Sequence, residues 1–342
     1  MTAALPPLLV AGAVERFLDE HGIGSGPIDA AEIGEGHSNL TYRIRREGAC
    51  VVLRRPPRPP LPPSAHDVLP EARVLRGLEG SGVPVPRVLA SCDDESLLGV
   101  PFYVMEYLDG VAMTTATPPG LRDPAHHSAM AHQMLSALAT LHGLDAEAHG
   151  LSDLGRPDGY LERQLRRFAA LWERGRTRAL PELDEVTEWL GANLPESGPG
   201  AIVHGDFRIG NLLFCRTAPV RLLGIVDWEM ATLGDPLADV GYLCAHLAER
   251  GDRGNVMTEL QPVTREEGFP DSRALAERYA ELTGRSLEHL RWYRVLAVWK
   301  SAIFLEQSYQ RFLSGSEQDP WFAAMGEGVP GLVARARSEA GL

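Results

Sequence analysis

Residues 204–211 read His-Gly-Asp-Phe-Arg-Ile-Gly-Asn, a polar H-G-D-x-x-x-x-N motif that directly follows the apolar, strand-like residues 201–203. A second short apolar run ends downstream at Asp227. A carboxylate on a loop after a strand, here Asp206, suits the acceptance of a proton from an attacking hydroxyl. Asn211 and Asp227 are hard oxygen ligands of the kind that hold Mg²⁺ against phosphates. These residue types in this order point to phosphoryl transfer.

Turn capping is the alternative interpretation of Asp206 and Asn211, since both residue types also cap turns. The strand end at Asp227 favours the chemical interpretation, because capping needs no second carboxylate downstream. We expect His204 to be structural, holding the loop by packing and hydrogen bonding.

The hydrophobic patterns on either side of the motif indicate two lobes of an α+β protein. The first hundred residues read as a small antiparallel sheet with one internal helix, after a leading helix over 8–20. From about residue 125 the periodicity becomes helical, apart from two short strand-like pieces at AIVHGD and LLGIVDWE. This order predicts a bilobal protein-kinase-like fold, with a small antiparallel β N-lobe over 1–108 and a larger, mostly helical C-lobe over 109–342.

Within the first lobe the expected elements have clear signals. Strands are expected in 33–47, at 50–54 and in the stretches VPVPRVLASC and FYVMEYLDG. The helix is expected to begin at Pro70, which suits a first helical position. The proline-rich connector 56–63 is too rich in proline for a helix or a central strand.

Composition excludes several other classes of protein. The formal net charge of -13 argues against a nucleic-acid-binding surface, which needs a basic face. The four cysteines are scattered without a C-x-x-C pair, which suits reduced thiols in the cytoplasm. The N-terminus lacks the basic segment of a signal peptide, and no apolar run is long enough to span a bilayer, so no membrane partner is expected.

At this point the chain resembles the aminoglycoside phosphotransferase and choline kinase-like family. Within that family it looks most similar to the kinase-like domain linked to acyl-CoA dehydrogenases. The resemblance covers nearly the whole chain and is carried by SNLTYRI, VVLRRPP, SAHDV, PFYVMEYLDG, HGDFRIGNLLF and DWEMATLGDPLADVGYL. It implies that Asp206 is the catalytic base, that Asn211 and Asp227 bind Mg²⁺, and that the buried Asp239 braces the catalytic loop.

The resemblance also implies a nucleotide site in the first lobe. A glycine-bearing loop would approach the phosphates, a strand would cover the adenine, and a hinge strand would offer backbone groups to the purine edge. The implied residues are Gly36, Ser38 and Asn39 in the loop, Val52 and Arg54 on the strand, Glu71 on the helix, and Met105, Glu106 and Leu108 at the hinge. Arg54 is a departure, because kinases usually carry lysine at this place and a guanidinium binds phosphate through a planar fork. ATP is the expected co-substrate, with GTP as the alternative, because backbone recognition does not separate them.

We expect the acceptor to be a small molecule with a hydroxyl group. The acyl-CoA-dehydrogenase branch implies a hydroxyacyl-CoA or related hydroxy acid, and an aminoglycoside or other natural product is the alternative. An amino-sugar pocket would need carboxylates, and the available candidates are Glu229, Glu306, Glu317 and Asp319. A catalytically weak, nucleotide-binding pseudokinase is the alternative from another class.

Overall fold

The computed structural model describes residues 8–34, 39–57 and 67–342. The chain divides into two compact units, the first of which contains residues 1–109 together with 223–229 and the second the rest. The short segment 223–229 therefore packs with the first unit, although it lies between the two halves of the second unit in sequence.

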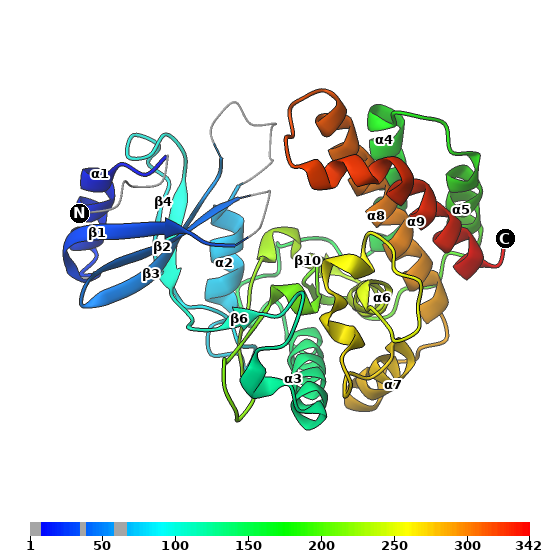
Figure 1. The fold of residues 1–342 in the computed structure, drawn as a ribbon, viewed down its shortest axis with the longest axis horizontal. Helices are drawn as coiled ribbons and strands as arrows, with labels where there is room; N and C mark the ends of the chain where they lie inside the picture. The colour runs from blue at the N-terminus through cyan, green and yellow to red at the C-terminus, as the bar shows by residue number, and fades with distance from the viewer. Residues whose placement is uncertain (1–7, 35–38, 58–66) are drawn as a thin grey trace. The chain divides into compact units, whose positions relative to one another are not determined.

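The first unit is built on an antiparallel sheet with the strand order β1-β2-β3-β5-β4 (Figure 1). Helix α1 contacts β1, and helix α2 contacts β4 and β5. The elements are α1 (Ala11–Glu20), β1 (Ser25–Glu32), β2 (Leu40–Glu47), β3 (Ala49–Arg55), α2 (Leu69–Leu78), β4 (Val88–Cys92) and β5 (Phe102–Glu106).

The first strand differs from the prediction. We expected two strands within 33–47, whereas β1 ends at Glu32 and only β2 falls in that range. Gly26 and Pro27 near the start of β1 weaken its strand signal, and proline is tolerated there because β1 is an edge strand of the sheet. The predicted glycine-bearing loop thus lies between β1 and β2, and its residues Gly36 and Ser38 lie outside the described residues, as does most of the proline-rich connector.

One face of this sheet forms an apolar core with α1. Val14, Phe17 and Leu18 of α1 are buried against Ile44 of β2 and Phe102 of β5. Leu69–Leu78 begins with proline in its first turn, as predicted, and its buried positions include Glu71. A charged side chain buried on a helix needs a partner, and that partner lies on β3.

The second unit is mostly helical (Figure 1). Its elements are β6 (Val111–Ala112), α3 (Pro124–His142), α4 (Tyr160–Gly175), α5 (Pro181–Ala192), β7 (Ala201–Val203), β8 (Leu212–Phe214), the start of β9 (Leu222–Ile225), β10 (Thr232–Gly234), α6 (Leu237–His246), α7 (Ser272–Thr283), α8 (Leu290–Leu313) and α9 (Met325–Ala340). Strand β7 pairs with β10, and β6 pairs with β8. The short strands carry polar loops at their ends, whereas the helices supply the core.

Helix α8 is the centre of this core and contacts α4, α5, α6 and α9. Its residues Trp292, Tyr293 and Trp299 are each at most 3% exposed. Phe304 of the same helix is 57% exposed, so the aromatic residues do not all face the core. Within the described residues, no helix is long and apolar enough to cross a membrane.

Candidate active site

The H-G-D-x-x-x-x-N motif forms one loop of the second unit, between β7 and β8. The Asn211 side chain donates from Nδ2 to Asp206 Oδ2 at 2.8 Å and to the Asp206 backbone carbonyl, also at 2.8 Å. Asp206 Oδ1 has no hydrogen-bond partner, although Arg208 Nε lies 3.4 Å from it. The loop therefore holds one carboxylate oxygen by a hydrogen bond and leaves the other able to accept a proton.

Asp239, on α6, holds this loop through hydrogen bonds to its backbone. Its Oδ2 accepts a hydrogen bond from the His204 backbone N–H at 2.7 Å, and its Oδ1 accepts one from the Gly205 N–H at 2.8 Å. His204 is fully buried, and its Nδ1 accepts a hydrogen bond from the Asp206 N–H at 3.2 Å. These contacts confirm the structural role expected of His204 and the bracing role expected of Asp239.

Gly205 is needed at this brace for two physical reasons. Its φ is +84°, in the left-handed region that other residues avoid. A Cβ atom at this position would also lie 2.6 Å from the backbone oxygen of Met230. Glycine therefore lets the loop turn sharply between the buried His204 and Asp206.

The brace itself is held in place by buried polar groups. The Asp239 carboxylate contacts His142 Nε2 at 3.2 Å, and His142 Nδ1 lies 2.7 Å from the Tyr279 hydroxyl. Burial by itself would raise the pKa of Asp239, but the contacts with His142 and His204 outweigh it and lower that pKa. Asp239 is thus a charged, fully partnered side chain in the interior.

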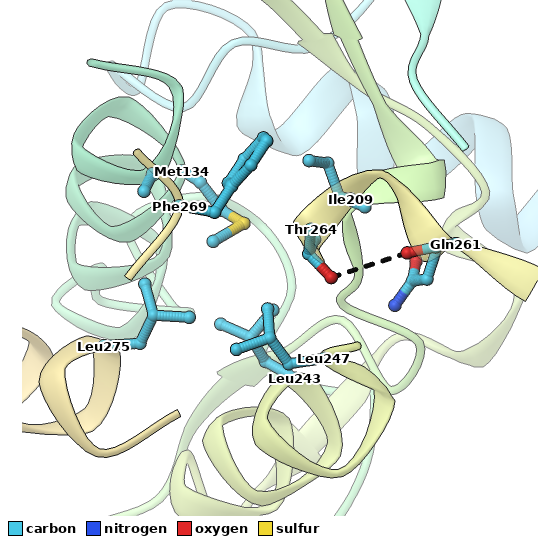
Figure 2. A pocket seen from close by; sticks show the side chains of 9 residues that line it. Met134, Ile209, Leu243, Leu247, Gln261, Thr264, Phe269 and Leu275 are labelled. Carbon is cyan, nitrogen blue, oxygen red and sulfur yellow. Dashed lines mark hydrogen bonds between the residues drawn. The ribbon is translucent and has the colours of Figure 1, made fainter. Parts of the chain in front are cut away.

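A small apolar cavity of about 10 Å³ lies next to this loop (Figure 2). It is too small for a ligand, since its volume is close to the space that a single water molecule needs. Gln261 connects it to the loop, because its Oε1 accepts a hydrogen bond from the Gly210 N–H at 3.4 Å and its Nε2 donates to the His246 carbonyl at 2.9 Å. The cavity lining is Ala131, Met134, Ile209, Leu243, Leu247, Gln261, Thr264, Phe269 and Leu275.

The first unit contains a second charged constellation, centred on Arg54. The Arg54 Nε atom donates to Glu71 Oε2 at 2.8 Å, and its second terminal nitrogen contacts Asp227 Oδ1 at 2.5 Å. A third nitrogen donates to the Thr41 hydroxyl at 3.3 Å. The Arg54 side chain is 11% exposed, so it is not a surface charge at the edge of a strand.

Electrostatics keep Arg54 charged within this cluster. Burial alone would lower the pKa of Arg54, but the carboxylates of Glu71 and Asp227 raise it above its ordinary value. Burial raises the pKa of Glu71 to about 7, against the lowering effect of Arg54. Arg54 thus forms an ion pair between β3 and α2 with Glu71, and its fork reaches Asp227 as well.

Asp227 has an unusual backbone conformation for a non-glycine residue. Its φ is +69°, in the left-handed region. Such strained positions persist where the surrounding structure determines them and gather at functional sites. Here the Arg54 contact holds the side chain, and the next backbone N–H, that of Trp228, donates to Glu71 Oε1 at 3.3 Å.

Among the loop residues predicted to approach phosphates, Asn39 is the one that the structure describes. Its Nδ2 donates to Glu229 Oε2 at 3.1 Å, and its own Oδ1 is buried without a partner. Glu229, one of the carboxylates predicted as candidates for an amino-sugar pocket, thus accepts a hydrogen bond from Asn39 within the first unit. Gly36 and Ser38 lie outside the described residues.

The predicted adenine-side residues lie together in the sheet. Val52 is 5% exposed and pairs in register with Met105 of the neighbouring strand β5. Strand β5 ends at Glu106, and Leu108 follows outside the sheet. A Cβ atom on Gly224 would collide with the Leu108 side chain, so glycine permits the close approach of this segment to the hinge.

Asn211 in the second unit and Asp227 in the first unit each have an oxygen atom of the kind that binds Mg²⁺. Asn211 uses its Nδ2 toward Asp206, which leaves Oδ1 as a potential ligand. Asp227 uses Oδ1 toward Arg54, which leaves Oδ2. Amide and carboxylate oxygens are the ligands that Mg²⁺ takes alongside substrate phosphates.

One proposed acceptor carboxylate is ruled out by its position. Glu306 has no exposed surface, and its oxygens accept hydrogen bonds from Thr177 and Arg178, the latter at 2.8 Å from Oε2. Sequence alone did not reveal this pairing, nor the Arg54–Asp227 contact, because both join residues more than a hundred positions apart. The Thr41 contact was also missed, although Thr41 faces Arg54 across the β2–β3 pair.

The fold, the Asp206–Asn211 loop and the Arg54 cluster together are typical of the kinase-like phosphotransferases. The chain belongs to the phosphotransferase enzyme family, whose family model matches residues 29–296. This confirms the resemblance seen in the sequence.

Individual relatives support the same assignment. Acyl-CoA dehydrogenase family member 10 of Mus musculus is 33% identical over 92% of the chain, and family member 11 of Gallus gallus is 36% identical over 68% of the chain. The chain spans only 29% and 30% of the length of these curated relatives. An aminoglycoside 3'-phosphotransferase of Streptomyces fradiae is 28% identical over 54% of the chain and 66% of its own length.

Solved structures show the same fold. A protein of Ralstonia eutropha JMP134, named as a candidate aminoglycoside phosphotransferase, superimposes with a TM-score of 0.82 at 29% identity, covering 96% of this chain and 98% of its own. The aminoglycoside phosphotransferase APH(4)-Ia, in a ternary complex with AMP-PNP and hygromycin B, has a TM-score of 0.62 at 18% identity, over 96% of this chain and 98% of its own. The latter likeness concerns the fold alone.

Proposed function

We propose that this chain transfers the γ-phosphate of a nucleoside triphosphate, with ATP favoured over GTP, to the hydroxyl of a small molecule. The observation that carries the proposal is the catalytic loop: Asp206 has one oxygen held by Asn211 and one oxygen without a hydrogen-bond partner. Turn capping does not account for this arrangement, because Asn211 spends its amide on Asp206 rather than on a helix end.

In the proposed reaction, Asp206 accepts the proton of the acceptor hydroxyl as the oxygen attacks the γ-phosphorus, and the nucleoside diphosphate leaves. Asn211 orients the Asp206 carboxylate through its 2.8 Å hydrogen bond. Asp239 holds the loop through the N–H groups of His204 and Gly205. When bound, Mg²⁺ would neutralise charge on the phosphates, with Asn211 and Asp227 as its protein ligands.

The first unit would bind the nucleotide. Val52 would cover the adenine, and the Met105–Leu108 hinge would offer backbone groups to it. Arg54 would contact the phosphates, with Glu71 orienting it, and the glycine loop with Gly36, Ser38 and Asn39 would cover them. The nucleotide-bound state of the structurally similar APH(4)-Ia supports this part of the proposal.

For the acceptor, we propose a hydroxyacyl-CoA or related hydroxy acid. Its support is the similarity to the acyl-CoA dehydrogenase family members. An aminoglycoside acceptor is the second candidate, supported by the Streptomyces fradiae relative. The burial of Glu306 weakens the second candidate, because it removes one of the few carboxylates that could face a polycation. A cytoplasmic location belongs to the proposal too, and the four cysteines are all free thiols, as a reducing compartment requires.

The test is the Asp206→Asn variant, which keeps the shape of the side chain but removes its basicity. We expect phosphate transfer to fall about 10²- to 10⁴-fold, which is the usual contribution of a general base. Nucleotide-dependent thermal stabilisation should persist, and Asp252→Asn, an exposed aspartate of the same unit, should leave the rate unchanged. If Asp206→Asn transferred phosphate at the wild-type rate, the assigned mechanism would be wrong. Nucleotide binding by a wild type that transfers phosphate to no acceptor would favour the pseudokinase.

A further inference from the structure

Lys300 is the one lysine among the 33 lysine and arginine residues of the chain. Even at position 54, where kinases usually carry lysine, this protein has arginine. An ammonium group differs from a guanidinium in being compact and in losing its proton readily when it is desolvated. Lys300 therefore supplies a cation that is smaller and more easily neutralised than any arginine of the chain.

Lys300 lies on α8, half-buried, against a ring of the neighbouring helix α4. Its Nζ atom is 4.7 Å from the centre of the Phe168 ring, and Phe168 itself is 5% exposed. Arg167, the residue before it, has its Cζ atom 6.0 Å from the same ring centre. Two cations thus share one aromatic side chain.

Neither cation is neutralised by a carboxylate in the described part of the chain. Both side chains contact the Phe168 ring instead. Other cations of the same unit do have partners, such as Arg178 with Glu306 at 2.8 Å. Arg167 is exposed and keeps its hydration, whereas an unpaired, half-buried ammonium such as Lys300 is unfavourable, and a nearby like charge makes it more so.

The surroundings of Lys300 include the catalytic loop. Burial lowers the pKa of Lys300 to about 8, and Arg167 lowers it further, while Asp239 and Asp206 raise it. Asp239 forms no ion pair with Lys300 in the described part of the chain, and its oxygens accept hydrogen bonds from the loop. Lys300 is therefore within electrostatic reach of the proposed base Asp206 and still lacks an anion.

We propose that Lys300 and Arg167, which both contact the Phe168 ring, form a subsite that binds an anionic group of the acceptor molecule. This inference rests on the proposed phosphotransferase function and adds to it the charge of the acceptor. A carboxylate or phosphate between the two cations would relieve their mutual repulsion and form charge-assisted hydrogen bonds. The anion could come from the carboxylate of a free hydroxy acid or from the phosphates of a CoA thioester.

A purely structural role for Lys300 does not explain these observations as well. A cation–π contact alone is weak when partly exposed, and a methionine would fill the same space without a desolvated charge. Burial lowers the pKa of Lys300, so its charged form is less favourable here than in water. An anionic ligand would remove that cost.

The first experiment compares acceptors that share the same hydroxyacyl group and carry or lack an anionic group. The pairs are 3-hydroxybutyrate with its methyl ester, and 3-hydroxybutyryl-CoA with its N-acetylcysteamine thioester, and kanamycin serves as a polycation. Wild type should prefer the charged member of one pair, and which pair shows the preference identifies the source of the anion. Lys300→Met should lose that preference, with kcat/KM for the charged acceptor falling about 10- to 100-fold, as expected for a hydrogen bond to a charged group.

Controls separate this effect from a general loss of activity. The KM for ATP and the slow hydrolysis of ATP by water should stay within about twofold in Lys300→Met, because neither involves the acceptor anion. Lys300→Arg keeps the charge and should retain part of the preference. Arg174→Met removes an exposed cation of α4 and should change nothing.

The second experiment needs no turnover. Because the chain contains one lysine, protein labelled with ¹³C at lysine Cε gives one side-chain signal, whose pH titration reports Lys300 alone. Butyrate and butyryl-CoA, which lack a hydroxyl, serve as anionic probes, and the butyryl N-acetylcysteamine thioester is the neutral control. We expect one anionic probe to raise the pKa of Lys300 by about one unit and the neutral control to leave it unchanged.

Two results would overturn the subsite. One is an unchanged Lys300 titration with both anionic probes at millimolar concentration. The other is a Lys300→Met enzyme that slows transfer to charged acceptors, neutral acceptors and water equally. If wild type transfers phosphate to nothing, the proposed function fails, and the lysine titration still decides whether Lys300 binds anions.

Discussion

The replacement Asp239→Asn tests whether the buried carboxylate positions the catalytic loop. Asparagine has the same shape, so no cavity forms, but one of its two terminal atoms becomes an NH₂ group. Asp239 now accepts N–H groups at both oxygens, from His204 at 2.7 Å and from Gly205 at 2.8 Å. In the variant at least one of these N–H groups, or His142, would face another donor.

The magnitude follows from these contacts. A hydrogen bond to a charged group contributes about 1.5–3 kcal/mol, and a buried donor left without a partner costs about 1–3 kcal/mol. The variant also avoids the cost of burying a charge, which offsets part of the loss. We therefore expect the free energy of unfolding of the second unit to fall by about 2–4 kcal/mol.

The pH dependence of this loss has a definite sign. The pKa of Asp239 is lowered in the folded state relative to its ordinary value of 3.8. Its stabilising contribution is therefore present above about pH 4 and is lost as the pH falls through the folded-state pKa. The difference in stability between wild type and variant should shrink in acid.

The assay is urea unfolding followed by tryptophan fluorescence. Five of the six tryptophans lie in the second unit, so the signal reports mainly that unit. The rate of phosphate transfer is measured in parallel, and we expect a loss of about 10²-fold, since a displacement near 1 Å at a catalytic group has that effect.

The matched control is Asp271→Asn, at the start of α7. Asp271 accepts a hydrogen bond from the Ala274 N–H at 2.8 Å as an exposed helix cap, and asparagine caps helices about as well. Its stability should change by less than about 0.5 kcal/mol. If Asp239→Asn unfolded within the same margin and kept its rate, the bracing argument would be refuted.

Two further predictions concern other buried charges. Arg54→Lys should lower kcat/KM for Mg–ATP about tenfold in steady-state kinetics, because an ammonium cannot contact Glu71 and Asp227 through a planar fork. A variant as active as wild type would contradict this prediction. Burial lowers the pKa of His246 from 6.5 to about 4, so the folded state resists protonation and wild type should lose stability as the pH falls from 6.5 to 4. His246→Gln should remove this slope, worth about 2 kcal/mol between pH 7 and pH 5, in urea unfolding at these two pH values, and an equal slope in both proteins would show that another group titrates.

Much of the fold was predictable because its signals are local. Hydrophobic periodicity placed β3, α2, α3 and β5 close to their observed positions. Strand β1 was misplaced because Gly26 and Pro27 hide the pattern of an edge strand, and its pairing with β2 compensates only in the folded sheet. The division after residue 108 likewise did not include 223–229 in the first unit, because a return of the chain to an earlier unit leaves no local pattern.

The candidate site divides along the same line. Asp206 and Asn211 are five residues apart, so their pairing within one loop depends on the sequence of that loop, and the motif was enough to single them out. The contact of Arg54 with Asp227 spans 173 positions, and that of Arg178 with Glu306 spans 128. Sequence lists such charged residues without saying which are buried together, since an ion pair in the interior is selected by the packing of distant elements. The sequence by itself thus determined which functional residue types are present in the loop motif. Only the tertiary structure decided which charged side chains are paired and which, like Lys300, lack a carboxylate partner in the described part of the chain, because packing brings distant elements together.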